Sequence, residues 1–130
     1  MGDTLWVLFE GRARQDDSDH MQMLNYSEEL DELAEALGQT PLSRFYDWTD
    51  YQFNLAEEGL DEDWIAENES WHLPAPAAAT LQALINALDS SQPPFRISKR
   101  ERHELVAELT DCLQKLRAAA GTQFHLCVVM

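Results

Sequence analysis

Basic residues are scarce in this chain. Only nine of its 130 residues are Lys or Arg, against 24 Asp and Glu, so the formal net charge at pH 7 is −15. A charge of this sign and size repels nucleic-acid phosphates and anionic membrane surfaces. We therefore expect neither nucleic acid nor a membrane among the partners of this protein.

Cysteines and long apolar runs are also few. The two cysteines, Cys112 and Cys127, lie in segments with helix and strand patterns, whereas a secreted disulfide-stapled domain has more cysteines, spaced through loops. Residues 5–9 form a short apolar run without a basic segment before it, and no run approaches the roughly 20 apolar residues that span a bilayer. We expect reduced, buried thiols and a cytoplasmic location.

The sequence lacks the common catalytic and ligand-binding signatures. Its five glycines are dispersed, so no glycine-rich loop could hold a phosphate, and no HExxH, CxxC or GxSxG motif occurs. Acidic residues crowd at 16–20 and 61–63, but neither stretch has the glycine and downstream glutamate of a calcium loop. His125 and Cys127 would share a strand face about 7 Å apart, too far for a hydrogen bond between base and nucleophile. We expect no catalytic residue, no metal site and no cofactor, and a structural, hydrogen-bonded role for His125.

Two apolar segments near opposite ends of the chain have the composition of buried strands. Residues 4–10 and 123–130 are rich in β-branched and aromatic side chains and are apolar on both faces. Because each strand needs a partner for its backbone N–H and C=O groups, we predict that the two pair with each other in one sheet.

Apolar spacing between these strands predicts helices. Residues 27–37 keep the i, i+3, i+4, i+7 pattern between Ser27, a candidate N-cap, and Gly38. A short helical turn should follow Pro41, and a further helix should begin near Pro76.

The last helix has the clearest pattern. It should run from a capping box formed by Ser98 and Glu101 to a stop at Gly121, with one continuous apolar face. The predicted architecture is a single α+β domain in which three to four helices cover a small sheet. Residues 47–71 have no sustained period, and 47–55 could form either a strand or a turn of helix.

The acidic residues are concentrated in one part of the chain. Residues 16–70 contain 17 Asp and Glu and a single basic residue, Arg44, and therefore carry −16, so the remaining residues sum to +1. Aromatic side chains within complementary charge are typical of protein interfaces, although acidic faces are often only solvated and aromatic residues often only core. The candidate binding residues in and beside this stretch are Asp61, Glu62, Asp63, Trp64, Trp48, Tyr51, Trp71 and His72.

Three segments carry a resemblance to known proteins. The segments are LRAAAGTQFHL at residues 116–126, SEELDELAEALG at 27–38 and WHLPAP at 71–76. With them, most of the chain resembles a group of small uncharacterised bacterial cytoplasmic proteins that end in the same helix followed by FHL. The resemblance implies a bacterial cytoplasmic source and carries no activity with it.

The charge and aromatic content favour a non-enzymatic protein-binding module of the inhibitor or immunity type. Its acidic, aromatic-bearing surface would bind a protein partner, with a basic one favoured by charge, and could mimic the nucleic acid that a basic toxin binds. The alternative is a small enzyme or ligand-binding protein with a pocket between helices and sheet, in which Trp71, His72 and the acidic loop supply polar groups. A homodimeric structural protein is a third hypothesis.

Overall fold

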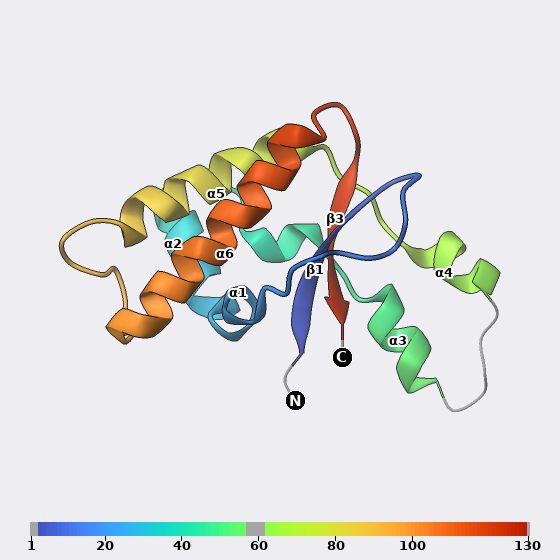
Figure 1. The fold of residues 1–130 in the computed structure, drawn as a ribbon, viewed down its shortest axis with the longest axis horizontal. Coiled ribbons are helices and arrows are strands. Elements are labelled where there is room, and N and C mark those ends of the chain that lie inside the picture. Colours follow the sequence, from blue (N-terminus) through green and yellow to red (C-terminus); the bar gives the residue numbers. More distant parts are fainter. Residues whose placement is uncertain (1–2, 57–61, 130) are drawn as a thin grey trace.

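The computed structural model describes residues 3–56 and 62–129 (Figure 1). At its centre lies a three-stranded sheet in the order β1-β3-β2, formed by β1 (Thr4–Phe9), β2 (Tyr46–Asp47) and β3 (Phe124–Val129). β1 pairs antiparallel with β3, with Leu5 opposite Val128, and the short β2 pairs parallel with the other side of β3. Pairing of the two terminal strands is confirmed.

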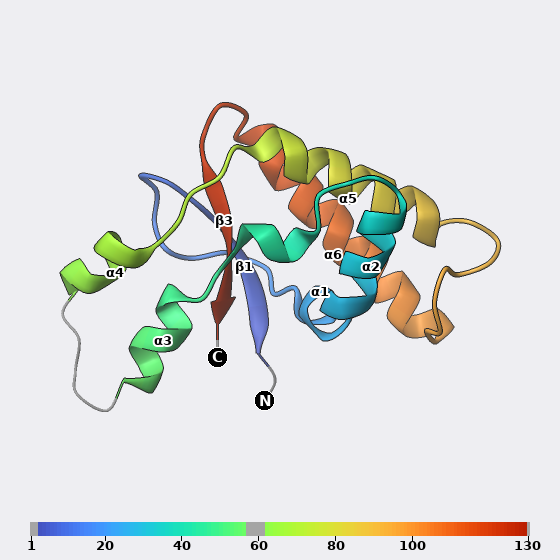
Figure 2. The same ribbon diagram turned by 180° about the vertical axis from the view of Figure 1, so that it is seen from behind.

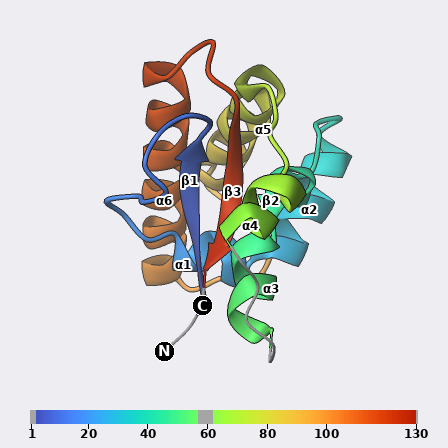
Figure 3. The ribbon, with the colours of Figure 1, turned by 90° about the vertical axis from the view of Figure 1, so that its right-hand side faces the viewer.

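Helices surround this sheet and make the fold α+β, as predicted. They are α1 (Met21–Asn25), α2 (Ser27–Ala36), the 3-10 helix η1 (Leu42–Phe45), α3 (Thr49–Leu55), α4 (Glu62–Asn68), α5 (Pro74–Leu88) and α6 (Lys99–Ala118). Viewed along the long axis, β1 and β3 lie side by side with the long helices α5 and α6 behind them (Figure 3). α3 and α4 lie at the opposite end of the long axis from the loop that joins α5 to α6 (Figures 1 and 2).

Local sequence signals explain where the long helices begin and end. The Ser98 hydroxyl accepts a hydrogen bond from the Glu101 backbone N–H at 3.2 Å, which is the capping interaction predicted for α6. α5 begins at Pro74 rather than near Pro76, since proline fits the first helical position. Ser27 is not an N-cap: it is the first residue of α2, and Tyr26 occupies the cap position because α1 ends there.

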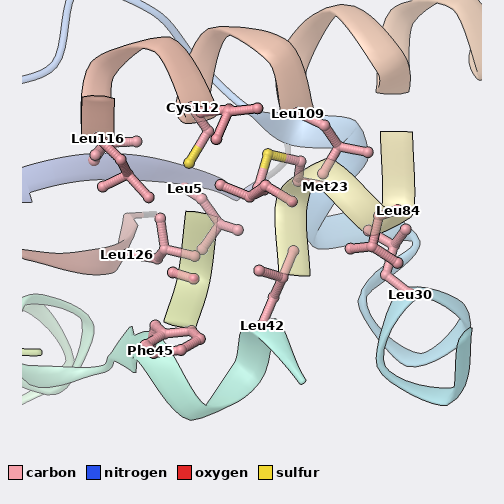
Figure 4. Close-up of a cluster of buried hydrophobic side chains, with 14 of the residues drawn as sticks. Leu5, Met23, Leu30, Leu42, Phe45, Leu84, Leu109, Cys112, Leu116 and Leu126 are labelled. Carbon is pink, nitrogen blue, oxygen red and sulfur yellow. The ribbon is translucent and has the colours of Figure 1, made fainter. Parts of the chain in front are cut away.

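The core lies between the sheet and the helices (Figure 4). Side chains from β1, β3, α1, α2, η1, α5 and α6 meet in it, including Leu5, Met23, Leu30, Leu42, Leu84, Leu109, Cys112 and Leu126. Because side chains alternate along a strand, Phe124, Leu126 and Val128 of β3 enter this core while His125 and Cys127 occupy the opposite face. Both faces of β3 are buried, as its apolar composition predicts.

The segment that the sequence left unassigned forms both structures that were considered for it. Residues 46–47 are the short strand β2, and α3 follows from Thr49. The five-residue α1 and the seven-residue α4 had no sequence prediction. Within residues 3–56 and 62–129, no helix has the length and apolar character needed to cross a bilayer.

Candidate functional site

The turn from β2 into α3 is built around the buried carboxylate of Asp47. Its Oδ1 accepts a hydrogen bond from the Thr49 backbone N–H at 2.9 Å, and its Oδ2 accepts one from the Ser70 N–H at 2.7 Å. Burial alone would raise the pKa of Asp47, but these hydrogen bonds stabilise the ionised form and hold the pKa below its ordinary value. A fixed carboxylate therefore sets the backbone on both sides of Trp48.

Trp48 projects from this turn into solvent. Asp47 and Thr49 are buried, whereas the Trp48 side chain is 47% exposed. Its indole packs edge to face against the ring of Tyr51, with centroids 5.5 Å apart at 83°. The structure thus brings two of the predicted binding residues together as one aromatic pair.

The exposed indole lines a pocket of about 270 Å³. Trp48 and Tyr46 form its aromatic part, and the end of α1 and the first turn of α2 complete it with Leu24, Asn25, Ser27, Glu28 and Glu29. Burial raises the pKa of Tyr46 to about 12, so its phenol is neutral at physiological pH. The charges among the lining residues are therefore those of Glu28 and Glu29.

An aromatic wall facing two carboxylates suits a cation. The face of an indole attracts ammonium and guanidinium groups, and a carboxylate accepts charge-assisted hydrogen bonds from them. Glu28 and Glu29 also lie in the first turn of α2, where negative charge stabilises the helix. The pocket can therefore receive a lysine or arginine side chain, whereas an anion would be repelled.

The acidic residues predicted at 61–63 fall only partly within the described structure. Asp61 and the side chain of Glu62 lie outside the described residues, although Glu62 is the first residue of α4. Asp63 is exposed and Trp64 is half-buried, and both belong to α4, which contacts α3. Among the described residues, Asp63 and Trp64 thus lie on a helix beside α3 and do not line the pocket.

Trp71 and His72 are held against the sheet. The Trp71 ring stacks on the buried His125 ring, with centroids 4.2 Å apart and 18° between planes. The backbone of His72 pairs with that of Phe124, and the His72 ring packs edge to face against Phe45. Trp71 and His72 therefore pack against the sheet and do not line the pocket at Trp48.

His125 and the two cysteines behave as structural groups. The His125 Nδ1–H donates a hydrogen bond to the Ser70 carbonyl at 2.8 Å, and burial lowers the pKa of this fully buried imidazole. Cys112 and Cys127 are free and buried, and burial raises the pKa of both thiols, that of Cys127 to about 12. Protonated thiols are poor nucleophiles. The predictions of buried, reduced cysteines and a hydrogen-bonded His125 are confirmed.

A partly buried ionic cluster, which the sequence did not reveal, lies beside β1. The Lys115 ammonium on α6 is ion-paired with Asp16, with Asp17 at 2.8 Å and with Asp111 at 2.9 Å. These contacts lower the pKa of Asp17 to about 2, mainly through the hydrogen bond to Lys115. The Lys115 ammonium lies among the carboxylates at the position where a metal ion would otherwise bind. In the described part of the chain, no group of His, Cys, Asp and Glu could hold a metal ion.

The same cluster covers the outer edge of β1. One oxygen of Asp16 accepts a hydrogen bond from the Val7 backbone N–H at 2.8 Å, and the His20 Nδ1–H donates one to the Leu5 carbonyl at 2.8 Å. Side chains therefore satisfy part of an edge that would otherwise be open to another strand. The acidic run at 16–20 contributes to stability here, and Lys115, distant in sequence, neutralises much of it.

Comparison with protein-family models finds no match to this chain. Comparisons with curated proteins and with solved structures find no match either. The resemblance to small bacterial proteins therefore stays a prediction.

Proposed function

We propose that this protein is a non-enzymatic protein-binding module of the inhibitor or immunity type, and that the surface around Trp48 binds a basic partner protein. One observation carries the proposal: the 47% exposed indole of Trp48 lines a pocket together with Glu28 and Glu29. A lysine or arginine of the partner would enter the pocket with its charged group beside the carboxylates. The aliphatic stem of the lysine, or the guanidinium plane of the arginine, would pack against the indole.

The fixed position of Trp48 supports binding at this place. Tryptophan is enriched among the residues that contribute most to protein interfaces, because it buries a large area in one rigid group. The buried Asp47 turn and the Tyr51 ring already restrain Trp48. Little side-chain freedom is then lost when a partner covers the indole, and this lowers the entropic cost of association.

The charge of the surrounding segment supports a basic partner. Residues 16–70 carry −16, and although Lys115 neutralises part of the run at 16–20, Glu28, Glu32, Glu35 and Asp63 are exposed. An extended field of one sign accelerates the encounter with an oppositely charged protein and opposes encounter with acidic ones.

The alternative of a small enzyme has less support from the described residues. Its candidate polar groups Trp71 and His72 pack against the sheet, and both thiols are protonated. A homodimer would be a special case of protein binding, but two copies would bring the same acidic surfaces together and repel each other.

The experiment is affinity capture from native cell extract with matched variants of the full chain. Trp48→Ala removes the indole, Glu28→Gln with Glu29→Gln removes the pocket carboxylates, and Glu32→Gln with Glu35→Gln removes the same charge from the same helix outside the pocket. Each variant is first shown to unfold at the wild-type temperature.

We expect the wild type and the Glu32/Glu35 variant to capture the same basic protein, and the Trp48 and Glu28/Glu29 variants to lose it. Equal capture by all four proteins would overturn the proposal. Equal loss of the partner from the Glu28/Glu29 and Glu32/Glu35 variants would also overturn the proposal. That result would show that the pocket carboxylates contribute no more to binding than the other acidic residues of α2.

A further inference from the structure

Basic side chains gather at the end of the molecule opposite α3 and α4. Five of them fall within residues 96–103, namely Arg96, Lys99, Arg100, Arg102 and His103. In Figure 1 this start of α6 lies at one end of the long axis, and α3 and α4 lie at the other. The basic cluster is therefore far from α3 and α4, whereas the acidic α2 lies in the same half of the molecule as the cluster.

The basic cluster lines a pocket of about 570 Å³ between the end of α5 and the first turns of α6. Leu88 and Val106 provide apolar surface, and the polar lining residues are Asp89, Lys99, Arg100, Arg102 and His103. Lys99, Arg102, His103 and Val106 recur at i, i+3, i+4 and i+7, so one stripe of α6 faces this pocket. A second pocket of about 250 Å³ shares Lys99 and Arg102 and adds Pro93 and Ile97.

Few contacts within the fold neutralise these cations. Arg100 makes an exposed ion pair with Glu104 at 3.4 Å, and Arg102 reaches the Ser90 carbonyl only at 3.5 Å. Across residues 3–56 and 62–129, no carboxylate pairs with Lys99, Arg102 or His103. Cations at the positive end of a helix also oppose its dipole, so the cluster destabilises α6.

We infer that this pocket binds a small amphipathic anion, that is, a phosphate or carboxylate group attached to an apolar body. The anionic group would lie among Lys99, Arg102 and His103, whose donors form charge-assisted hydrogen bonds. The apolar body would cover Val106 and Leu88. A volume of 570 Å³ falls within the roughly 300–1,000 Å³ that small-molecule sites occupy.

The overall charge of the protein limits the ligand to a small one. A polyanion such as nucleic acid would extend beyond the basic cluster and meet the repulsion of the remaining surface. A single anionic group is attracted mainly by the cations that it contacts, because the field of exposed charges farther away than about 8–10 Å is screened in physiological salt. The inference concerns the basic cluster only and is independent of the function proposed for Trp48.

The test is a titration of the ¹⁵N-labelled full chain followed by NMR. The probes are phenyl phosphate, benzoate, inorganic phosphate and benzyl alcohol, the last two carrying only the anion or only the apolar body. We expect saturable shifts of the amides at residues 88–89 and 99–106 with phenyl phosphate or benzoate, and weaker binding of the two partial probes. If phenyl phosphate binds more tightly the preferred anionic group is a phosphate, and if benzoate does it is a carboxylate.

Matched variants distinguish a site from general attraction of anions. Lys99→Gln with Arg102→Gln should weaken the tighter probe about tenfold or more, the loss typical of charge-assisted hydrogen bonds. Arg117→Gln removes a cation from the far end of the same helix, outside this pocket, and should leave the affinity unchanged. Equal weakening by both changes, equal affinity for inorganic phosphate and phenyl phosphate, or no saturable shift with any probe would overturn the inference.

Discussion

His20 and Asp111, 91 residues apart in sequence, are joined by a hydrogen bond of 2.8 Å between Nε2 and Oδ2. The other ring nitrogen of His20, Nδ1, lies 2.8 Å from the Leu5 carbonyl oxygen, which can only accept. The Asp111 carboxylate also only accepts, because its pKa is lowered: the hydrogen bonds and charges of Lys115 and His20 outweigh the effect of burial. His20 therefore links β1, at the Leu5 carbonyl, to α6, at the Asp111 carboxylate.

Replacement of His20 by Gln should destabilise the protein by about 2–3 kcal/mol, because a buried charge-assisted hydrogen bond is lost. Urea unfolding measures the loss. His103→Gln is the control, since His103 is exposed on α6, and it should change the free energy of unfolding by no more than about 0.5 kcal/mol. Equal effects of the two changes would show that the link from β1 to α6 contributes nothing to stability.

Leu109→Ala should lower the free energy of unfolding by about 2–5 kcal/mol, because the side chain is fully buried in the core. That is a large part of the roughly 5–15 kcal/mol typical of a folded domain. Leu73→Ala serves as a comparison, since Leu73 is 65% exposed and should be replaced with little effect. A loss below about 1 kcal/mol for Leu109→Ala would contradict the packing of α6 described above.

Stability should depend on pH through His125. Burial lowers the pKa of its imidazole below the ordinary value of 6.5. Below pH 6.5 the unfolded chain therefore binds a proton that the folded protein does not, so the contribution of His125 is complete above that pH and declines as pH falls toward the folded pKa. His125→Asn should lower the free energy of unfolding at every pH, and it should remove the part of the decline below pH 6.5 that comes from His125. Unfolding curves between pH 5 and pH 8 check it, and parallel profiles for wild type and variant would contradict it.

Association with the basic partner proposed for the Trp48 surface should slow as salt rises, because exposed charges are screened over about 8–10 Å at 0.1–0.15 M. Glu32→Gln with Glu35→Gln, outside the pocket, should mainly slow association, whereas Trp48→Ala should mainly accelerate dissociation, by roughly 30-fold for a central anchor. Surface plasmon resonance separates the two rates. An association rate that is independent of salt would exclude electrostatic steering.

The long elements were predictable because their signals are local. The apolar face of α6 and its Ser98 cap can be read from neighbouring residues, and both terminal strands are continuous apolar runs that need a backbone partner. The two-residue β2 and the short helices α1 and α4 are too brief to show a period, and contacts with the rest of the protein hold them in place.

The sequence predicted which kinds of residue form the candidate site, but not which of them lie together. Sequence reasoning selected Trp48 and Trp71 alike, since both lie within or beside acidic residues. The structure separates them, because the buried Asp47 turn directs Trp48 to solvent while Trp71 covers His125. It also adds Glu28 and Glu29, which line the same pocket as Trp48 although they lie about 20 residues before it in the sequence.

By itself the sequence determined the α+β class, the pairing of the terminal strands and an excess of acidic charge, because these follow from composition and local periodicity. Tertiary structure decided which charges remain available. Lys115, 99 residues from Asp16 in sequence, forms ion pairs with Asp16 and Asp17, while Glu28 and Glu29 line an open pocket. Interactions between charges and the exposure of a side chain depend on distances in space, and only the packing of the helices on the sheet sets those distances.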